Sequence, residues 1–229
     1  MAAVSSGSGK TTVVTGLLSA LRNQGIKVQS YKIGPDYIDP GYHRLASGRP
    51  AHNIDTWLMS KETMVNTFID TAQNMDVAII EGVMGLYDGG RGGISSTAEI
   101  ARLLQAPVIL VIDCKSMGAS AAAIALGFRE YAKDVHIAGV ILNRLCSENH
   151  QKMIEEAMAG IGMPVLGAVR RDNLLTMPER HLGLLPVEEN QDRQVVDAMG
   201  EAMGRQINLT ALLQIAHNAS PLAKIPSQA

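Results

Sequence analysis

A glycine-rich segment close to the start of the chain restricts its fold more than any other feature. Residues 5–12 read Ser-Ser-Gly-Ser-Gly-Lys-Thr-Thr, and they lie between a short apolar run, residues 1–4, and a helical pattern. This composition between a strand and a helix is typical of a phosphate-binding loop, because glycine lets successive N–H groups point at phosphate oxygens and the helix start adds its positive dipole end. The segment therefore predicts a nucleoside triphosphate site.

The positions of this loop have individual expected roles. The residues expected to bind ATP are Ser6, Gly7, Ser8, Gly9, Lys10, Thr11 and Thr12. Lys10 would reach the β- and γ-phosphates, and the Thr11 hydroxyl would ligate Mg²⁺. The usual motif has a glycine where this chain has Val4, so a flexible serine- and glycine-rich loop is the alternative. The flanking strand and helix favour the phosphate-binding interpretation.

Short β-branched apolar runs alternate with longer helical patterns along most of the chain. The predicted strands are residues 28–33, 77–80, 108–112, 137–142 and 165–169, and the predicted helices are about residues 10–24, 61–74, 97–104, 119–132 and 149–160. Alternating βα units build a parallel sheet, and continuously apolar strands indicate helices on both sheet faces. We expect an α/β fold of the P-loop NTPase type, with a mostly parallel sheet flanked by helices on both faces. The first strand, near residues 1–4, is unusually short or has lost its start.

Composition excludes several classes of protein. Hydrophobic residues make up 46% of the 229 residues and charged residues 18%, as in a packed domain, and the formal net charge of -2 argues against a general nucleic-acid or membrane-surface binder. The chain has neither an apolar run of membrane-spanning length nor a signal-peptide pattern, so the expected location is the cytoplasm. Cys114 and Cys146 are too few for a disulfide framework and are expected to be small apolar fillers.

Acidic residues follow two of the predicted strands. Asp36 and Asp39 come after residues 28–33, and Glu81 and Asp88 come after residues 77–80. Because ligands of open parallel sheets bind beyond the carboxyl ends of the strands, these carboxylates would meet at the phosphate loop. A Mg²⁺ ion would compensate their charge, and Glu81 is the strongest candidate because an acid that ends an apolar strand has no low-cost structural role. A turn-shaping role is the alternative for the aspartates.

Four further segments form a specific combination. They are residues 32–43 (Lys-Ile-Gly-Pro-Asp-Tyr-Ile-Asp-Pro-Gly-Tyr-His), 53–57 (Asn-Ile-Asp-Thr-Trp), 81–89 (Glu-Gly-Val-Met-Gly-Leu-Tyr-Asp-Gly) and 180–184 (Arg-His-Leu-Gly-Leu). Together they resemble the synthetase domain of the cobyrinic acid a,c-diamide synthases over nearly the whole chain. That family is similar to dethiobiotin synthetase in fold. It uses ATP and Mg²⁺ to amidate the a and c acetate carboxylates of a corrin ring.

The resemblance implies a role for each matching residue. Lys10, Asp39 and Asp88 would be catalytic, with Asp88 near the carboxylate that is activated. Thr11, Asp36 and Glu81 would hold the metal. Tyr37 and Ile38 would contact the corrinoid, together with Asp39. Asn143 and Arg144 would lie on the adenine side of the nucleotide, with residues 180–185 closing over the base.

Cations are also expected near the substrate, because an anionic carboxylate must approach an anionic phosphate. The candidates are Arg44, Arg49, Arg91, His43 and His52, of which Arg44 and Arg91 are taken as substrate ligands. Surface salt bridges are the alternative for the arginines, and a structural hydrogen bond is favoured for the histidines. Trp57, the single tryptophan, is expected to be a buried aromatic residue more than a platform for the substrate.

Full-length members of this family carry a second, glutamine-hydrolysing domain whose nucleophilic cysteine lies in a Gly-rich elbow. Neither Cys114 nor Cys146 resembles that elbow. We therefore expect a synthetase domain at residues 1–217 and, at residues 218–229, a linker toward an absent glutamine amidotransferase domain. The expected partners are a tetrapyrrole polycarboxylate and a separate glutaminase as the source of ammonia, with no nucleic acid and no membrane. A homodimer is left open.

Three other functions remain open from the sequence. A nickel-sirohydrochlorin a,c-diamide synthase would have similar motifs, so the ring and its metal are undecided. A ParA/MinD-like regulatory ATPase would be expected to carry a further lysine near the loop start and often an amphipathic tail, and neither is visible. A non-catalytic regulator is opposed by intact Lys10, Thr11, Glu81 and Asp88.

Overall fold

The structure of the chain is a computed structural model that describes residues 1–171 and 189–226. The strands are β1 (Ala2–Ala3), β2 (Val28–Ile33), β3 (His52–Ile54), β4 (Val77–Glu81), β5 (Val108–Asp113), β6 (Ile137–Leu145) and β7 (Val165–Arg170). The helices are α1 (Lys10–Asn23), α2 (Asp39–Ser47), α3 (Lys61–Ala72), α4 (Thr97–Leu103), α5 (Ser120–Tyr131), α6 (Glu148–Gly160), α7 (Glu189–Gln206) and α8 (Leu209–His217), with a 3₁₀ turn η1 (Arg91–Gly93). Every predicted strand and helix is present, with ends that differ by a few residues at most.

The strands form two parallel sheets that meet at β1. One sheet has the order β1-β5-β6-β7 and the other has the order β3-β2-β4, and each strand pairing is parallel. The Met1 amino group donates to the Ile80 carbonyl at 2.8 Å, and the Gly82 N–H donates to the Met1 carbonyl at 2.9 Å. Thus β1 lies between β4 and β5. The predicted mostly parallel sheet is confirmed, and so is the shortness of the first strand.

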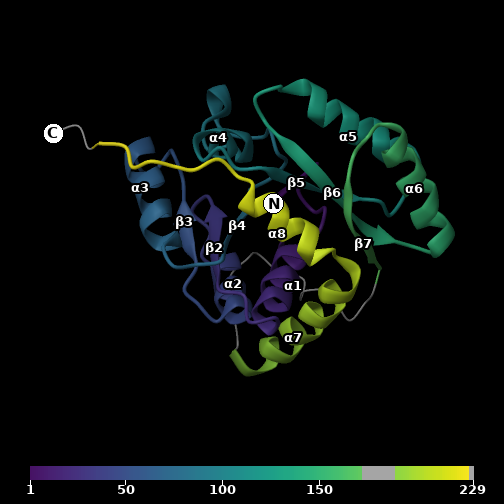
Figure 1. The fold of residues 1–229 in the computed structure, drawn as a ribbon, viewed down its shortest axis with the longest axis horizontal. Helices are drawn as coiled ribbons and strands as arrows, with labels where there is room; N and C mark the ends of the chain where they lie inside the picture. Colours follow the sequence, from purple (N-terminus) through teal and green to yellow (C-terminus); the bar gives the residue numbers. More distant parts are fainter. Residues whose placement is uncertain (172–188, 227–229) are drawn as a thin grey trace.

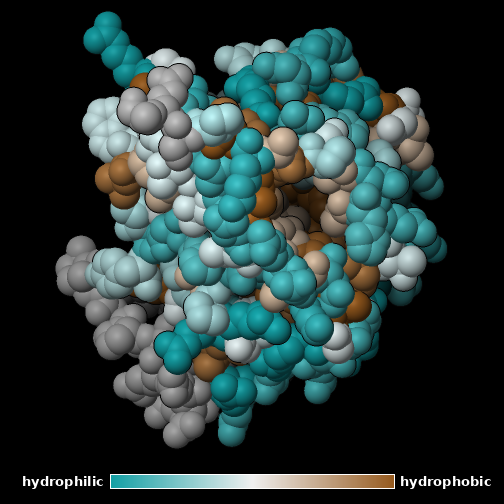
Figure 2. Space-filling view, turned by 60° about the vertical axis from the view of Figure 1, so that its left-hand side comes forward, coloured by the Kyte–Doolittle hydropathy of each residue, from teal (hydrophilic) through white to brown (hydrophobic). Residues whose placement is uncertain are grey.

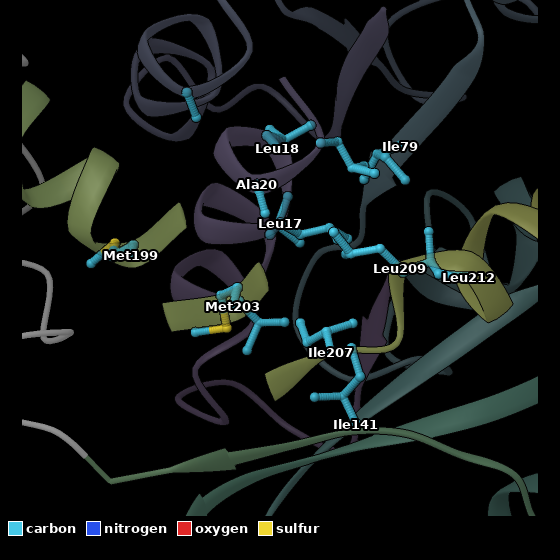
Figure 3. Close-up of a cluster of buried hydrophobic side chains, with 14 of the residues drawn as sticks. Leu17, Leu18, Ala20, Ile79, Ile141, Met199, Met203, Ile207, Leu209 and Leu212 are labelled. Carbon is cyan, nitrogen blue, oxygen red and sulfur yellow. The ribbon is translucent and has the colours of Figure 1, made fainter. Parts of the chain in front are cut away.

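Helices cover both faces of these sheets (Figure 1). On one face α1, α7 and α8 bury a cluster that includes Leu17, Met203 and Ile141 (Figure 3). On the other face α5 and α6 pack over β5 and β6, while α3 and α4 pack over β2 around Tyr31. Because both faces are covered, β5 is apolar from Val108 to Ile112 and almost completely buried.

Sequence patterns missed three helices and one strand. Residues 39–47 contain Asp, Pro and Gly and show no clear helical pattern, yet they form α2, in which Pro40 occupies the first turn that tolerates proline. The strand β3 is too short to give a pattern, and α7 and α8 lie beyond the predicted elements. Ser96 caps the start of α4, since its hydroxyl accepts from the Glu99 N–H at 3.1 Å.

The end of the described chain, residues 218–226, extends from α8 along α3 (Figure 1). Asn66 holds it with two hydrogen bonds, from its amide to the Ile225 carbonyl at 2.9 Å and from the Ile225 N–H to its oxygen at 3.0 Å. The linker role of this segment stays a prediction. Among the described residues, no helix is both long and apolar enough to cross a membrane.

Candidate functional site

The phosphate loop connects β1 to α1 and is held by its own side chains and by β6. The Ser8 hydroxyl donates to the Ser5 carbonyl at 2.8 Å. Gly9 has a φ of 83°, and a Cβ at this position would lie 2.3 Å from Nδ2 of Asn143, so only glycine fits here. Ser6 and Gly7 are exposed, whereas Thr11 and Thr12 are half-buried at the start of α1.

Asn143 and Arg144, the predicted adenine-side residues, end β6 beside this loop. The Asn143 amide is buried and donates to the Ser8 carbonyl at 2.9 Å. Arg144 has a left-handed φ of 60° and donates to the Asp113 carboxylate at 2.5 Å. The structure therefore places both residues at the loop, and adenine binding stays a prediction. Residues 180–185, predicted to close over the base, lie outside the described residues.

Lys10 is buried, and its ammonium group donates to the Met84 carbonyl at 2.9 Å. Burial and, to a lesser extent, repulsion from Lys32 lower the pKa of Lys10 to about 8, although the charges of Glu81 and Asp39 oppose the change. A bound phosphate would give Lys10 an anionic partner, whereas the Met84 carbonyl is a neutral acceptor. This position and charge suit the role predicted for Lys10.

Glu81 is the centre of a buried polar cluster. Its Oε1 atom accepts from the Thr11 hydroxyl at 2.6 Å, and the same hydroxyl lies 3.4 Å from Oδ2 of Asp39. Burial alone raises the pKa of Glu81, but the hydrogen bond with His43 and the charge of Lys32 outweigh it and hold the pKa well below its usual range. Glu81 is therefore ionised, as a metal or phosphate site requires. The predicted residues Thr11, Asp39 and Glu81 do meet at one point.

Lys32 is a member of this cluster that the sequence analysis left without a role. Its ammonium nitrogen lies 2.7 Å from Oδ2 of Asp39, 3.0 Å from Oε1 of Glu81 and 3.9 Å from Oδ2 of Asp36. Burial lowers its pKa, but Glu81 and Asp39 reverse the effect, so the pKa is raised and Lys32 is charged. A lysine inside a predicted strand that helices cover on both faces was the available signal, because a buried ammonium needs carboxylate partners.

His43 supports Glu81 from α2. Its side chain is completely buried, and its Nε2 atom lies 2.6 Å from Oε2 of Glu81. Because Glu81 is ionised, Nε2 donates and the carboxylate accepts. The Nδ1 atom of His43 has no hydrogen-bond partner among the described residues. His43 therefore has the structural role that the sequence favoured, not a substrate-facing one.

Asp36, a predicted metal ligand, shapes the turn between β2 and α2. Its Oδ1 atom accepts from the N–H groups of Ile38 at 2.8 Å and Asp39 at 3.1 Å. Burial raises its pKa, but these two backbone hydrogen bonds more than compensate, and the pKa is lowered. The turn-shaping alternative is thus observed, while Oδ2 still faces Lys32.

Other predicted residues lie around the rim of the site. Asp88 is exposed, and its carboxylate accepts from the Gly85 N–H at 3.0 Å, which shapes the loop after β4. Arg44 and Arg91 are exposed and Arg49 and His52 half-buried, whereas Ile38 is half-buried at the start of α2. The structure does not bring these side chains into the Glu81 cluster, so their roles stay predictions.

Trp57 corrects the expectation of a buried aromatic residue. It is 74% exposed, and Tyr37, at the same sheet edge, is 69% exposed. The Asp55 carboxylate fixes Trp57 at the surface, since it accepts from the Trp57 N–H at 2.6 Å and from the Ser95 hydroxyl at 2.7 Å. The turns after β2 and β3 therefore present aromatic rings to solvent, which sequence patterns alone do not reveal.

The cysteines differ from one another. Cys114 is buried, and burial, reinforced by the charge of Asp113, raises the pKa of its thiol to about 12. It is the expected apolar filler. Cys146 is exposed, so the same expectation is wrong for it. Cys114 therefore lacks the lowered thiol pKa of an activated nucleophile.

The donor set of the cluster suits Mg²⁺ bound together with a nucleotide. Within the described residues, no group of three or more His, Cys, Asp and Glu side chains is placed to hold a metal by itself. Magnesium in nucleotide sites takes most of its ligands from phosphates and water and needs only one or two protein oxygens. The Thr11 hydroxyl and the Glu81 carboxylate converge within 2.6 Å and meet that requirement.

Comparisons with known proteins identify the family of the chain. Residues 1–185 match the family described as CobQ/CobB/MinD/ParA nucleotide binding domain. The hydrogenobyrinate a,c-diamide synthase of Streptomyces coelicolor is 47% identical over 227 residues, which are 97% of this chain and 47% of that protein. The cobyrinate a,c-diamide synthase of Dehalococcoides mccartyi is 46% identical over 230 residues, which are 99% of this chain and 50% of that protein. The predicted resemblance is confirmed.

A solved structure supports the fold. The nucleotide-binding protein in complex with ADP from Archaeoglobus fulgidus superposes with a TM-score of 0.54 at 14% identity and covers 97% of this chain and 91% of that one. The chain spans about half the length of the curated relatives that it matches.

Proposed function

Since the chain belongs to the family of CobQ/CobB/MinD/ParA nucleotide-binding domains, we propose that it uses ATP to activate the a and c acetate carboxylates of a corrin ring for amidation. The observation that carries this proposal is the convergence of Lys10, Thr11, Asp39 and Glu81 at one sheet edge, with Lys32 between the carboxylates. The names of the relatives supply the substrate class, hydrogenobyrinate or cobyrinate.

The reaction needs activation because ammonia does not displace oxide from a carboxylate. In the proposed first step, a carboxylate oxygen attacks the γ-phosphorus of ATP, the bond to the bridging oxygen breaks, and ADP leaves. Ammonia then attacks the acyl phosphate carbon, inorganic phosphate leaves, and the nitrogen loses a proton to give the amide. Catalysis of phosphoryl transfer depends mainly on position and charge neutralisation.

Residues of this chain can supply both requirements. The loop N–H groups and Lys10 would bind the β- and γ-phosphates, and Thr11 and Glu81 would hold Mg²⁺ with Asp36 nearby. When bound, Mg²⁺ would neutralise the charge that develops on the phosphates. The ion pair between Asp39 and Lys32 would hold these side chains in place on the side of the site from which the substrate carboxylate approaches.

The exposed rim would bind the ring. Tyr37 and Trp57 are exposed at the carboxyl ends of β2 and β3, where a flat, largely apolar macrocycle could cover them. The exposed Arg44 and Arg91 would pair with peripheral carboxylates of the substrate. Ile38, between Asp36 and Asp39, would help to decide which acetate arm reaches the phosphate.

We propose that ammonia comes from solution or from a separate glutaminase. Cys114 is buried with a raised thiol pKa, and the sequence around Cys146 does not resemble the Gly-rich elbow of a glutamine-hydrolysing domain. The 229-residue chain is therefore expected to use ammonium but not glutamine as its nitrogen donor.

A product assay tests the proposal. The purified chain would be incubated with MgATP and either hydrogenobyrinate or cobyrinate, with ammonium chloride or glutamine, and products would be separated by chromatography with mass detection. We expect mono- and diamides with ammonium only, and none from Lys10→Met. If nickel-sirohydrochlorin were amidated in preference to both corrinoids, the chain would instead be assigned as a nickel-sirohydrochlorin a,c-diamide synthase. ATP hydrolysis without any amide product would instead favour a regulatory ATPase.

A further inference from the structure

The hydrophobic residues of the surface are unevenly distributed. On the face that Figure 2 presents, most residues are hydrophilic and the hydrophobic ones lie chiefly around a hollow. One group of exposed residues occupies the connections from β2, β3 and β4 to the helices that follow them, and it consists of Tyr37, Trp57, Leu58, Met84 and Ile94, each at least 37% exposed. Because parallel strands end at the same edge, this group lies at the edge of the phosphate loop. Exposed apolar side chains that gather in one place indicate a binding surface.

Asp55 fixes the turn that follows β3. Its side chain is buried, although Trp57, two residues later, is among the most exposed residues of this group. One carboxylate oxygen, Oδ1, accepts from the Trp57 N–H at 2.6 Å and from the Leu58 N–H at 3.3 Å. The same oxygen accepts from the Ser95 hydroxyl at 2.7 Å. Burying a carboxylate is costly unless hydrogen bonds compensate, so Asp55 determines the course of the backbone that carries Trp57.

Ser95 belongs to a different connection, between β4 and α4. Its φ of 58° is in the left-handed region, which is unfavourable for serine. Its N–H donates to Oε2 of Glu99 at 2.8 Å and to the Thr56 hydroxyl at 3.2 Å. Its hydroxyl, which donates to Asp55, also lies 3.1 Å from the Trp57 nitrogen and accepts from that N–H. A strained residue that several neighbours hold in place indicates a functional constraint.

Ser95 directly follows a compact glycine-rich turn that carries Arg91. In this turn the Gly90 N–H donates to the Ile94 carbonyl at 2.8 Å, and the Gly93 N–H donates to the Gly90 carbonyl at 2.8 Å. Arg91 is exposed. Because the turn is closed by its own hydrogen bonds, the position of Ser95 determines where Arg91 is presented to solvent.

We propose that Asp55 is a positioning residue for the substrate: through Ser95 it sets the separation between the Trp57 ring and the Arg91 guanidinium, so that a flat ring with peripheral carboxylates contacts both. This inference rests on the proposed function, which supplies that ligand. The indole offers the ring a flat apolar surface, and the guanidinium pairs with a carboxylate in a fixed geometry. Two contacts with one rigid ligand give most affinity when their separation is fixed before binding.

Fluorescence tests the connection without any substrate, because Trp57 is the only tryptophan of the chain. We expect Asp55→Ala and Ser95→Ala to increase the amplitude of the fast component of the anisotropy decay at least about twofold. Asp55→Asn keeps a side-chain acceptor and should stay close to the parent. Asn208→Ala is the matched control, since Asn208 accepts from the Ala211 N–H at 3.0 Å at the start of α8, and it should leave the anisotropy unchanged.

Ring binding is measured by the quenching of Trp57 emission with cobyrinate, corrected for absorption, and nucleotide binding by calorimetry with MgADP. We expect the Kd for cobyrinate to rise about tenfold in Asp55→Ala and about threefold in Ser95→Ala, while the Kd for MgADP stays within about twofold of the parent. The effects should not add in the double variant, because both substitutions break the same connection. Asn208→Ala should bind cobyrinate as the parent does.

The outcomes distinguish this inference from the proposed function. Unchanged anisotropy in both single variants, additive effects on cobyrinate binding, or an unchanged Kd for cobyrinate would overturn the positioning role of Asp55, whether or not the parent forms amides. A parent that binds cobyrinate but forms no amide would overturn the proposed function alone, and one that does not bind cobyrinate would overturn both. Ser95→Ala provides the same readouts if Asp55→Ala fails to fold.

Discussion

Phosphate binding needs the positive charge of Lys10, but the surroundings of this residue destabilise its protonated form. Its pKa of about 8 means that it is mostly protonated at pH 7 and mostly neutral at pH 9. A bound phosphate raises the pKa, so nucleotide binding takes up a proton and weakens as pH rises through 8. We expect the affinity for a non-hydrolysable ATP analogue to fall roughly tenfold from pH 7 to pH 9 in calorimetric titrations. In Lys10→Arg, whose guanidinium stays charged, the affinity should not change between pH 7 and pH 9. The same fall in affinity in the parent and in this variant would contradict this role of Lys10.

Glu81 links function to stability, because its carboxylate is fully buried and paired with Thr11, Lys32 and His43. Its pKa is lowered in the folded state, so its ionised form stabilises the fold above its unfolded pKa, near 4.5. This contribution is lost as pH falls through the folded pKa. We expect Glu81→Gln to lower the free energy of unfolding at pH 7 by about 1–3 kcal/mol, because Lys32 and His43 lose a charged hydrogen-bond acceptor while Asp39 still pairs with Lys32.

Urea unfolding at pH 7 and pH 4 measures this effect. The loss caused by Glu81→Gln should be smaller at pH 4, where the parent protein begins to lose the same interaction. Asp88→Asn is the control, since Asp88 is exposed and contacts a backbone N–H, and it should cost about 1 kcal/mol or less. Equal losses for the two variants would show that the buried cluster does not stabilise the fold.

At the scale of elements, the packing of α1 against α7 depends on glycines. A Cβ on Gly200 would lie 2.3 Å from Oγ and 2.7 Å from Cβ of Ser19, whereas a Cβ on Gly204 would meet only Cβ of Ala20, at 3.7 Å. We expect Gly200→Ala to lower the free energy of unfolding by about 1–3 kcal/mol through overpacking. Gly204→Ala should instead raise it by up to about 1 kcal/mol, because alanine is favoured in helices. Thermal unfolding of both variants tests the contrast, and the same sign for both would contradict the close approach.

For the whole molecule, the described end of the chain lies over α3, where Leu222 and Ile225 pack against the cluster around Tyr31. Asn66 makes two hydrogen bonds with Ile225. We expect Asn66→Ala to destabilise the protein by about 1–3 kcal/mol and to speed amide exchange at Ile225. Lys224→Ala removes an exposed ion pair with Asp70 and should cost about 1 kcal/mol or less. Unchanged exchange at Ile225 in Asn66→Ala would show that side-chain burial alone holds the segment.

The sequence by itself determined the layered α/β fold, the phosphate loop and the family. These depend on local signals: apolar runs with helical patterns between them, a glycine-rich turn, and acids that directly follow strands. Such signals act over a few residues, so they can be read without knowing which strands are neighbours.

The tertiary structure decided which of those residues meet. Lys32 and His43 lie far from Glu81 in sequence but share its carboxylate because β2, α2 and β4 converge, and Trp57 lies at the surface because Asp55 and Ser95 hold its turn. Burial and pKa depend on distances across the fold, and these distances exist only after the helices and strands have packed.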